Sequence, residues 1–324
     1  VYKRQPYIHS SSSSGNGFST SGSQYVIVRN IQVEGYDSSI SIKNSNYSVL
    51  DNVYTRGGRD YCISGFDHAL IQGRIINSYA ADSPGHGVRV AGERNLIDNL
   101  YVSSYGRPDM DYYISVYGSK KGLAESIVRN CKIIRDPSDT HTGHGISLRG
   151  NGMPVENSLI EDIYIEAVGS AIEVRSEFVQ RCVYRNITVD NLGLKEGSYQ
   201  AIRITGGQHN ILDRITGINC GWAVQFLGSD ESSTRAPDAG NNNIIKNSLF
   251  YNSSQTPGQY VVYVRKYKVS SLRRVPNNNR FENCTLYNFG SLFYKNETSR
   301  DNRNKFVKCI IDKVTKKLSH SSQA

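Results

Sequence analysis

A seven-residue phrase returns eleven times along the chain, and this repeat restricts the possible folds more than any other feature of the sequence. The phrase reads apolar, apolar, polar, polar, apolar, variable, apolar. Its copies are IVRNIQV (27–33), VLDNVYT (49–55), IQGRIIN (71–77), LIDNLYV (96–102), IVRNCKI (127–133), LIEDIYI (159–165), VYRNITV (183–189), ILDRITG (211–217), IIKNSLF (244–250), RFENCTL (280–286) and KFVKCII (305–311). The fourth residues of successive copies are 22 to 36 residues apart, so each unit has a constant part and a loop of variable length, which is typical of a solenoid.

Each unit contains at least two strands. The last three positions of the phrase alternate inward and outward, as in Ile163-Tyr164-Ile165, and a period of two indicates a strand rather than a helix. A second strand pattern recurs at SISIKN (39–44), HGVRVAG (86–92), YISVYG (113–118), HGISLRG (144–150), AIEVRS (171–176), AIRITGG (201–207), AVQFLG (223–228) and VVYVRK (261–266). The 22 tyrosines and 29 glycines suit many short strands joined by turns.

We therefore predict an all-β chain that forms a single right-handed parallel β-helix of about eleven rungs over residues 1–324. Residues 1–24 are expected to form an irregular N-terminal segment, and residues 312–324 a basic C-terminal tail. A β-propeller, the alternative repeat architecture, needs about four strands and about 40 residues per unit, and the units here are mostly shorter.

Two kinds of side chain are expected to stack inside the rungs. Stacked amides can hydrogen-bond from one rung to the next. Asparagine recurs just before the phrase, at Asn95, Asn210, Asn243, Asn279 and Asn304. Cys131, Cys284 and Cys309 follow the fourth residue of the phrase at an inward position, so we interpret them as small buried apolar residues with free thiols. A disulfide between Cys284 and Cys309, on successive rungs, is the alternative.

The outward residues of the second strands are expected to form one polar face. If the apolar residues point inward, those between them line up in columns across the rungs. The predicted ligand-contacting residues of this face are His86, Arg89, Tyr113, Tyr117, His144, Arg149, Glu173, Arg175, Arg203 and Tyr263. Guanidinium groups bind carboxylates and sulfates bidentately, so the face predicts a groove for an anionic polysaccharide or oligosaccharide. The alternative is that Glu173, Arg175 and Arg203 form only a surface ion-pair network.

The segment GHGISLRGNG (143–152) and the rung after it are similar to the polygalacturonase stretch that contains Gly-His-Gly-Ile-Ser, with His144 at the position of the family's histidine. Together with the repeats, this makes nearly the whole chain resemble the pectin-lyase-like β-helix superfamily, which holds polysaccharide lyases, pectin hydrolases, uronan epimerases and phage tailspikes. The family's Arg-Ile-Lys segment falls on Glu173-Val174-Arg175, and of three expected aspartates at most Asp111 is present. The resemblance implies a function that involves carbohydrate. The differences from the family's motif argue against an ordinary polygalacturonase.

We expect first a lyase that cleaves a uronate-containing glycan by β-elimination. Arg149 and Arg175 would neutralise the substrate carboxylate, while His144 and Tyr117 would act as base and acid. The backbones of His144 and Tyr117 are expected to lie about 5 Å apart on adjacent rungs.

Two other functions remain open. A glycoside hydrolase of the polygalacturonase-like type would use Asp111 and Glu173, which are expected two rungs and roughly 10 Å apart, near the upper end of the spacing in inverting enzymes. A noncatalytic glycan-binding or tailspike-like adhesion module would use the same arginine and tyrosine residues as a receptor site.

The formal net charge of +9 favours acidic partners. Neither a phosphate-binding glycine loop nor a His-Glu-x-x-His motif occurs, which leaves nucleotide and zinc chemistry without support. We expect a glycan as the partner and no nucleic acid. No run approaches the roughly 18 apolar residues of a membrane helix, so no membrane partner is expected. An extracellular, cell-surface or virion-associated location is inferred, although no signal peptide is visible.

No cofactor is expected, with one alternative. Carboxylates in loops favour hard cations, so Asp111, Asp136 or Asp139 are candidate Ca²⁺ ligands. The same segment, Asp136-Pro137-Ser138-Asp139-Thr140-His141, is distantly similar to the Asp-Pro-His segment of alginate epimerases, and His141 is a further candidate for substrate binding.

Overall fold

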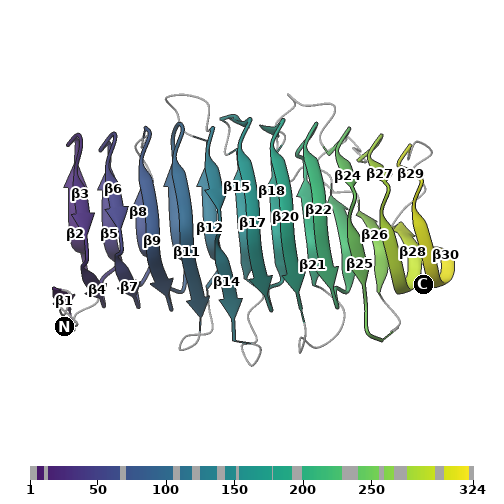
Figure 1. Cartoon of the computed structure of the whole chain (residues 1–324), viewed down its shortest axis with the longest axis horizontal. Coiled ribbons are helices and arrows are strands. Elements are labelled where there is room, and N and C mark those ends of the chain that lie inside the picture. Colours follow the sequence, from purple (N-terminus) through teal and green to yellow (C-terminus); the bar gives the residue numbers. More distant parts are fainter. Residues whose placement is uncertain are drawn as a thin grey trace.

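The computed structural model is one elongated stack of parallel strands, with the two termini at opposite ends of its long axis (Figure 1). The structure describes residues 6–10, 14–65, 71–104, 110–118, 125–136, 143–150, 153–176, 178–191, 199–227, 240–254, 259–265, 276–295 and 303–320. Every regular element within these ranges is a strand, and the described part of the chain contains no helix of the length and apolar character needed to span a membrane. The predicted all-β parallel β-helix is confirmed.

One ladder of parallel strands, called sheet 1 here, corresponds to the second strand of each unit. It contains β2 (Asn16–Ser21), β5 (Ser38–Lys43), β8 (Tyr61–Gly65), β10 (His86–Ala91), β12 (Tyr112–Tyr117), β15 (His144–Arg149), β18 (Ser170–Arg175), β21 (Gln200–Thr205), β23 (Trp222–Leu227) and β26 (Tyr260–Arg265). Each strand pairs in parallel with the next in this order, so equivalent residues of successive rungs lie side by side.

The seven-residue phrases form two further ladders. Sheet 2 contains β3 (Ile27–Arg29), β6 (Val49–Asp51), β13 (Ile127–Arg129), β24 (Ile244–Lys246), β27 (Arg280–Glu282) and β29 (Lys305–Val307). Sheet 3 contains β1 (Tyr7–His9), β4 (Gln32–Glu34), β7 (Tyr54–Arg56), β14 (Lys132–Arg135) and β25 (Leu249–Tyr251). Strands that run through both are β9 (Arg74–Ala81), β11 (Leu96–Ser104), β17 (Leu159–Glu166), β20 (Val183–Asp190) and β22 (Ile211–Ile218).

The remaining strands change the predicted ends of the domain. The strands β28 (Thr285–Lys295) and β30 (Ile310–His320) pair along their length, and β28 also pairs with both β25 and β26. Residues 312–320 are therefore part of a strand rather than a separate tail, because their backbone groups bond to the preceding rung. Residues 1–24 are likewise not irregular throughout, since β1 and β2 pair with β4 and β5. A small separate ladder joins β16 (Val155–Glu156) and β19 (Val179–Gln180).

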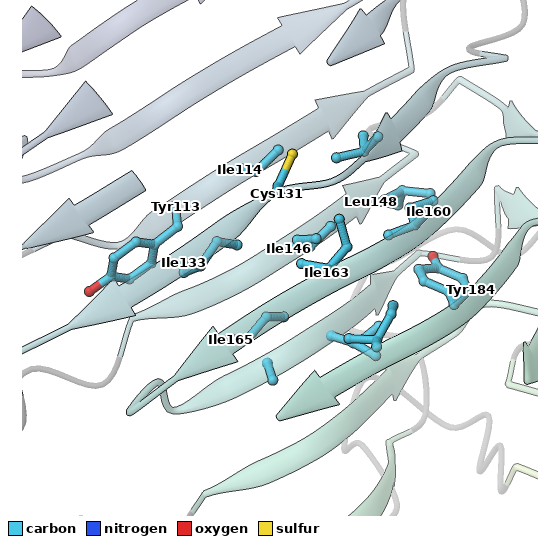
Figure 2. Packing of buried hydrophobic residues seen from close by; sticks show 14 of the residues in the cluster. Tyr113, Ile114, Cys131, Ile133, Ile146, Leu148, Ile160, Ile163, Ile165 and Tyr184 are labelled. Carbon is cyan, nitrogen blue, oxygen red and sulfur yellow. The ribbon is translucent and has the colours of Figure 1, made fainter. Parts of the chain in front are cut away.

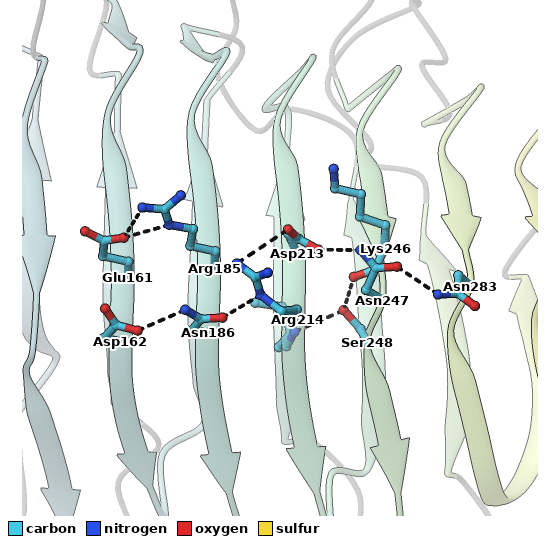
Figure 3. A network of polar contacts seen from close by, with 11 residues as sticks. Glu161, Asp162, Arg185, Asn186, Asp213, Arg214, Lys246, Asn247, Ser248 and Asn283 are labelled. Atoms are coloured by element: carbon cyan, nitrogen blue, oxygen red, sulfur yellow. Dashed lines mark hydrogen bonds and ion pairs between the residues drawn. The ribbon is translucent and has the colours of Figure 1, made fainter.

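The fourth residue of the phrase makes the bend between sheets 2 and 3. Ten of the eleven predicted fourth residues have φ between 51° and 57°, a left-handed conformation that asparagine and aspartate tolerate best. Their amides bridge exposed positions of successive rungs, as where Nδ2 of Asn283 donates to Oδ1 of Asn247 at 2.9 Å and Nδ2 of Asn186 donates to Oδ1 of Asp162 at 3.0 Å (Figure 3).

The third copy of the phrase was assigned three residues too early. Arg74 pairs with Val49 and Leu96, which are the first residues of their own phrases, so the true copy is RIINSYA (74–80). Its fourth residue is Asn77, whose φ is 50°. Neither segment matches the apolar pattern of the phrase at every position, so strand pairing rather than the pattern decides the alignment.

Apolar columns fill the interior in register. One of them passes through every strand of sheet 1 from β5 to β26, and its members are Ile40, Ile63, Val88, Ile114, Ile146, Ile172, Ile202, Val224 and Val262. Figure 2 shows Ile114 and Ile146 of this column facing Ile133, Ile163 and Ile165 of sheet 3. All six cysteines are free. Cys131 and Cys284 are buried, as predicted for small apolar residues, whereas Cys309 is only partly buried.

The predicted asparagine ladder is present at its C-terminal half. Asn243 is fully buried: its Nδ2 donates to the carbonyl of Gly207 and to Oδ1 of Asn279, and its Oδ1 accepts from the backbone and side-chain nitrogens of Asn210. Oδ1 of Asn304 extends the row by accepting from Asn279. Each amide thus satisfies turn backbone on a neighbouring rung.

Replacing Asn243 with alanine is expected to lower the free energy of unfolding by about 3 kcal/mol, because four buried hydrogen bonds are lost together. The matched control is Asn247→Ala, which removes two exposed amide contacts and should cost about 1 kcal/mol. Urea unfolding followed by circular dichroism measures both. Equal losses in the two variants would contradict the role assigned to the buried ladder.

Candidate functional site

Sheet 1 presents three outward columns of polar and aromatic side chains. The first lies at the strand starts and contains Tyr61, His86, Tyr112 and His144. The second lies three residues further along and contains Arg89, Ser115, Ser147, Glu173, Arg203, Gln225 and Tyr263. The third contains Ala91, Tyr117, Arg149 and Arg175. The structure therefore places most of the predicted site residues on neighbouring rungs of one face.

The first column is a continuous aromatic stack. Ring centroids are 5.3 Å apart from Tyr61 to His86, 5.0 Å from His86 to Tyr112 and 4.9 Å from Tyr112 to His144, with the ring planes close to parallel. This spacing follows directly from the separation of parallel strands, about 4.8 Å. The stack restrains all four rings, because rotation would break contacts with two neighbours at His86 and Tyr112 and with one neighbour at Tyr61 and His144.

Tyrosine hydroxyls hold three arginines of this face. The bonds run from Arg89 Nη1 to Tyr61 Oη at 2.6 Å, from Arg149 Nη1 to Tyr117 Oη at 2.8 Å and from Arg175 Nη1 to Tyr112 Oη at 3.2 Å. The guanidinium of Arg149 also lies 5.2 Å from the ring centroids of both Tyr112 and Tyr117. Cations held in this way lose little side-chain entropy when they bind an anion, so the face is preorganised for one.

Both histidines of the stack are held in the neutral form. Burial is the main reason that the pKa of His86 falls to about 3, and the charges of Arg89 and Arg149 lower it further. Its Nδ1 lies 3.0 Å from Oγ of Ser115. Burial also lowers the pKa of His144, assisted by Arg203, Arg175 and Arg149 and opposed by Glu173.

Glu173 is a buried carboxylate in the middle of the face. Its side chain has no exposed surface, and Oγ of Ser147 donates to its Oε2 at 2.7 Å. Its Oε1 lies 4.0 Å from Nδ1 of His144 and 3.9 Å from Nε of Arg203. Burial raises the pKa of Glu173, but His144, Arg203, the Ser147 hydrogen bond and Arg175 outweigh burial and hold it below its usual value. Because His144 is itself neutral near pH 7, Arg203 and Ser147 carry most of this stabilisation there.

One predicted contact residue lies in the core instead. Tyr113 has no exposed surface, and its hydroxyl lies 2.6 Å from Oγ of Ser104 inside the coil (Figure 2). The outward residue of that rung is Tyr112, because it is the register partner of His86 and His144. The sequence does contain a signal for Tyr112. In three rungs the second-strand pattern ends in a glycine, and the outward residue stands six positions before it. These glycines are Gly92, Gly118 and Gly150.

Tyr61 was also missed, because the short pattern of its rung was not recognised as a strand. It stacks on His86 and accepts the hydrogen bond from Arg89, so it begins the site. The other predicted contact at the far end of the face, Tyr263, stacks on Trp222 with ring centroids 4.2 Å apart.

The prediction that the backbones of His144 and Tyr117 lie about 5 Å apart is wrong. Tyr117 is the register partner of Arg149, five residues beyond His144 along the strand direction and so roughly 16 Å away. The ring of Tyr117 leans back toward the strand start, where its centroid lies 6.4 Å from that of His86. Tyr117 and His144 are connected through Arg149 and Tyr112 rather than by direct contact.

The two candidate hydrolytic carboxylates have unlike surroundings. Asp111 is exposed and directly precedes β12 at the edge of sheet 1, whereas Glu173 is fully buried. Glu173 is also the only acidic residue within the strands from β2 to β26 of sheet 1.

The predicted loop ligands are only partly described. Asp139 and His141 lie outside the described residues, while Asp111 and Asp136 lie within them. Among the described residues no group of three or more His, Cys, Asp or Glu side chains is arranged to hold a metal ion.

No family model matches the sequence, and no curated protein matches it. Solved structures match the fold. An alginate lyase from Paenibacillus sp. str. FPU-7 has a TM-score of 0.56 at 14% identity, over 90% of this chain and 92% of the lyase. The tailspike protein of E. coli bacteriophage HK620, solved in complex with a pentasaccharide, has a TM-score of 0.58 at 11% identity, over 97% of this chain.

The catalytic domain of a GH87 α-1,3-glucanase, solved in complex with nigerose, has a TM-score of 0.62 at 13% identity over 94% of this chain. The chain spans 58% of the glucanase chain and 58% of the tailspike chain. All three likenesses are at low identity, so they concern the fold. They show that this chain shares its parallel β-helix fold with these proteins.

The buried neutral histidines predict a loss of stability in mild acid. The pKa of His86 is about 3 in the folded state and near 6.5 in an unfolded chain, so the unfolded state gains a proton first and stability falls as pH drops below 6.5. Between pH 6.5 and 4.5, His86→Phe should therefore lose several degrees less thermal stability than the wild type, while keeping the ring stack. His9→Phe, in exposed β1, is the control. An unchanged pH dependence in His86→Phe would refute the assignment.

Proposed function

We propose that this chain is a carbohydrate-active enzyme that binds an acidic polysaccharide along sheet 1 and cleaves it by β-elimination. The observation that carries the proposal is the set of tyrosine-held arginines beside a neutral histidine on one face. The solved structures with this fold support a glycan as the ligand, since they include an alginate lyase and proteins crystallised with oligosaccharides. An extracellular or surface location belongs to the same proposal.

The charge of the face supports an anionic sugar. Within β10 to β21 the outward columns carry four arginines, Arg89, Arg149, Arg175 and Arg203, against the single carboxylate of Glu173. That carboxylate lies beneath the surface, so an approaching ligand meets the arginines first. A guanidinium plane matches a carboxylate or sulfate in a bidentate arrangement, which gives a uronate or a sulfated sugar both affinity and orientation.

β-Elimination needs three functions, and the described residues offer a group for each. Arg149 and Arg175, register partners on adjacent rungs, bind the uronate carboxylate and stabilise the negative charge that develops when the neighbouring carbon loses its proton. Neutral His144 accepts that proton. The electron pair of the broken C–H bond forms the new C=C bond as the glycosidic C–O bond breaks. Tyr117, whose oxygen accepts from Arg149, donates its own proton to the leaving oxygen.

Hydrolysis by a carboxylate pair is less well supported by the described residues of sheet 1. An inverting or retaining glycosidase uses two carboxyl groups that flank the scissile bond. Glu173 is buried and held by Ser147, and Asp111 stands outside the strand at the edge of the sheet. A purely binding module shares the arginine and tyrosine face but needs no base, and the enzyme assay distinguishes the two.

Incubation with a panel of uronans, including alginate and polygalacturonate, is expected to increase the ultraviolet absorbance of the unsaturated product with at least one polymer. Tyr117→Phe and His144→Ala should each reduce kcat by roughly 100-fold or more in protein that circular dichroism shows to be folded. Arg185→Ala, on sheet 2, is the control and should keep full activity. New reducing ends without absorbance would indicate a hydrolase instead, and binding without turnover would indicate an adhesion module.

Arg175→Ala is expected to weaken binding of an acidic oligosaccharide about tenfold or more, because a charge-assisted contact is lost. Binding of the wild type should weaken as salt increases, and the variant should show less of this dependence. Trp222 is the single tryptophan of the chain and lies on sheet 1, so quenching of its fluorescence provides the titration signal. Equal affinity for acidic and neutral oligosaccharides would disprove the anionic assignment.

A further inference from the structure

Three buried polar atoms converge where β15, β18 and β21 meet on sheet 1. They are Nδ1 of His144, Oε1 of Glu173 and Nε of Arg203, and none of the three has a hydrogen-bond partner among the described residues. Oε1 stands between the other two, 4.0 Å from Nδ1 and 3.9 Å from Nε. Buried polar atoms are nearly always paired, so this arrangement needs an explanation beyond surface charge balance.

The carboxylate is fixed by its other oxygen. Oγ of Ser147 donates to Oε2 at 2.7 Å, and Ser147 is the register partner of Glu173 on the preceding rung. With Oε2 held, Oε1 can only point toward the gap between His144 and Arg203. A side-chain rotation that shortens the separation by about 1 Å brings Oε1 and Nδ1 to hydrogen-bond distance.

The imidazole is fixed in the complementary orientation. Its ring stacks on Tyr112 with centroids 4.9 Å apart, and Nδ1 is the buried nitrogen that faces Glu173. The His144 side chain is 18% exposed. Because Nδ1 is buried, Nε2 is the ring nitrogen that can face a ligand on sheet 1. A carboxylate can only accept, so the tautomer that suits this contact carries its proton on Nδ1.

We propose that Glu173 is a positioning residue, which keeps the proton of His144 on Nδ1 and so presents an unprotonated Nε2 at the outer face of sheet 1. The sequence pattern grouped Glu173 with the reacting residues, but its complete burial keeps it from touching the substrate. When Nε2 takes a proton from the sugar, the Glu173 carboxylate stabilises the resulting imidazolium without itself being protonated. Arg203 and Ser147 keep Glu173 ionised for this role. The catalytic part of this inference rests on the proposed function, whereas the tautomer does not.

The wild-type protein without any glycan provides the first test. In ¹⁵N-histidine-labelled protein, the ring nitrogen shifts of His144 should show the Nδ1–H form, with the signal assigned by its loss in His144→Gln. A dominant Nε2–H form would overturn the proposal, and this measurement needs no variant of Glu173 to fold.

Glu173→Gln provides the second test. The carboxamide keeps the volume and can still accept from Ser147, but its NH₂ group would donate to Nδ1 and move the histidine proton to Nε2. The matched control is Glu156→Gln, which alters a buried glutamate bound by Gln180 and Arg181 outside sheet 1. Glu173→Gln should change the His144 tautomer and Glu156→Gln should not. An unchanged tautomer in Glu173→Gln would overturn the proposal.

Kinetics separate positioning from binding. Glu173→Gln should lower kcat by roughly 100-fold with little change in KM, because the base is misoriented while the arginines still hold the substrate. The groups around His144 are Tyr112, Glu173, Arg149, Arg175 and Arg203, and of these only Glu173 raises its pKa. The acid limb of the kcat/KM profile should therefore move to lower pH in Glu173→Gln. A variant that keeps full kcat and an unshifted profile would overturn the positioning role.

The two proposals can fail separately. If no uronan is cleaved but the His144 tautomer still depends on Glu173, then β-elimination is wrong and the positioning of the imidazole stands. If a uronan is cleaved while the tautomer is Nε2–H, then the lyase function stands and the role given to Glu173 is wrong.

Discussion

In-register pairing of parallel strands is the constraint on which the rest of this structure depends. Each strand of sheet 1 pairs with the equivalent strand of the next rung, so like residues stack on like along the molecule. Stacking of isoleucine and valine fills the interior, and stacking of asparagine satisfies buried turn backbone at Asn210, Asn243 and Asn279. A slip of one residue in any rung would turn its apolar side chains outward, so the buried columns and the outer face specify each other.

The same pairing that stabilises the core also places like charges next to each other on the outer face. It brings Arg149 beside Arg175 as register partners, and like charges on adjacent strands repel. The structure offsets this with tyrosine rings and hydroxyls that contact the guanidinium groups, and with the carboxylate of Glu173 beneath them. A ligand that carries its own negative charges would relieve the remaining repulsion. This physical reason, more than the fold, supports the proposal of an acidic polymer as the ligand.

The fold by itself does not choose a chemistry. Proteins with this architecture include an alginate lyase, an α-1,3-glucanase and a tailspike, at 11 to 14% identity to this chain. A function for this chain must therefore be argued from the side chains that its own rungs display. In this chain those side chains include arginine, tyrosine, histidine and one buried glutamate, and that combination is the basis for proposing β-elimination rather than attack by a carboxylate pair.

Hydrophobic spacing in the sequence determined the class of fold and the approximate number of rungs. It also determined which face carries the candidate site, because a period of two assigns each residue to the inside or the outside of a strand. The residues of that face are Arg89, Tyr117, His144, Arg149, Glu173 and Arg175. The spacing could not decide register where the pattern is matched incompletely. Arg74 was therefore taken for Asn77, and Tyr113 for Tyr112, until backbone pairing with neighbouring rungs fixed the alignment. Only the tertiary structure buried Glu173 and brought its Oε1 toward His144, since burial and side-chain approach depend on three rungs at once and no local pattern contains them.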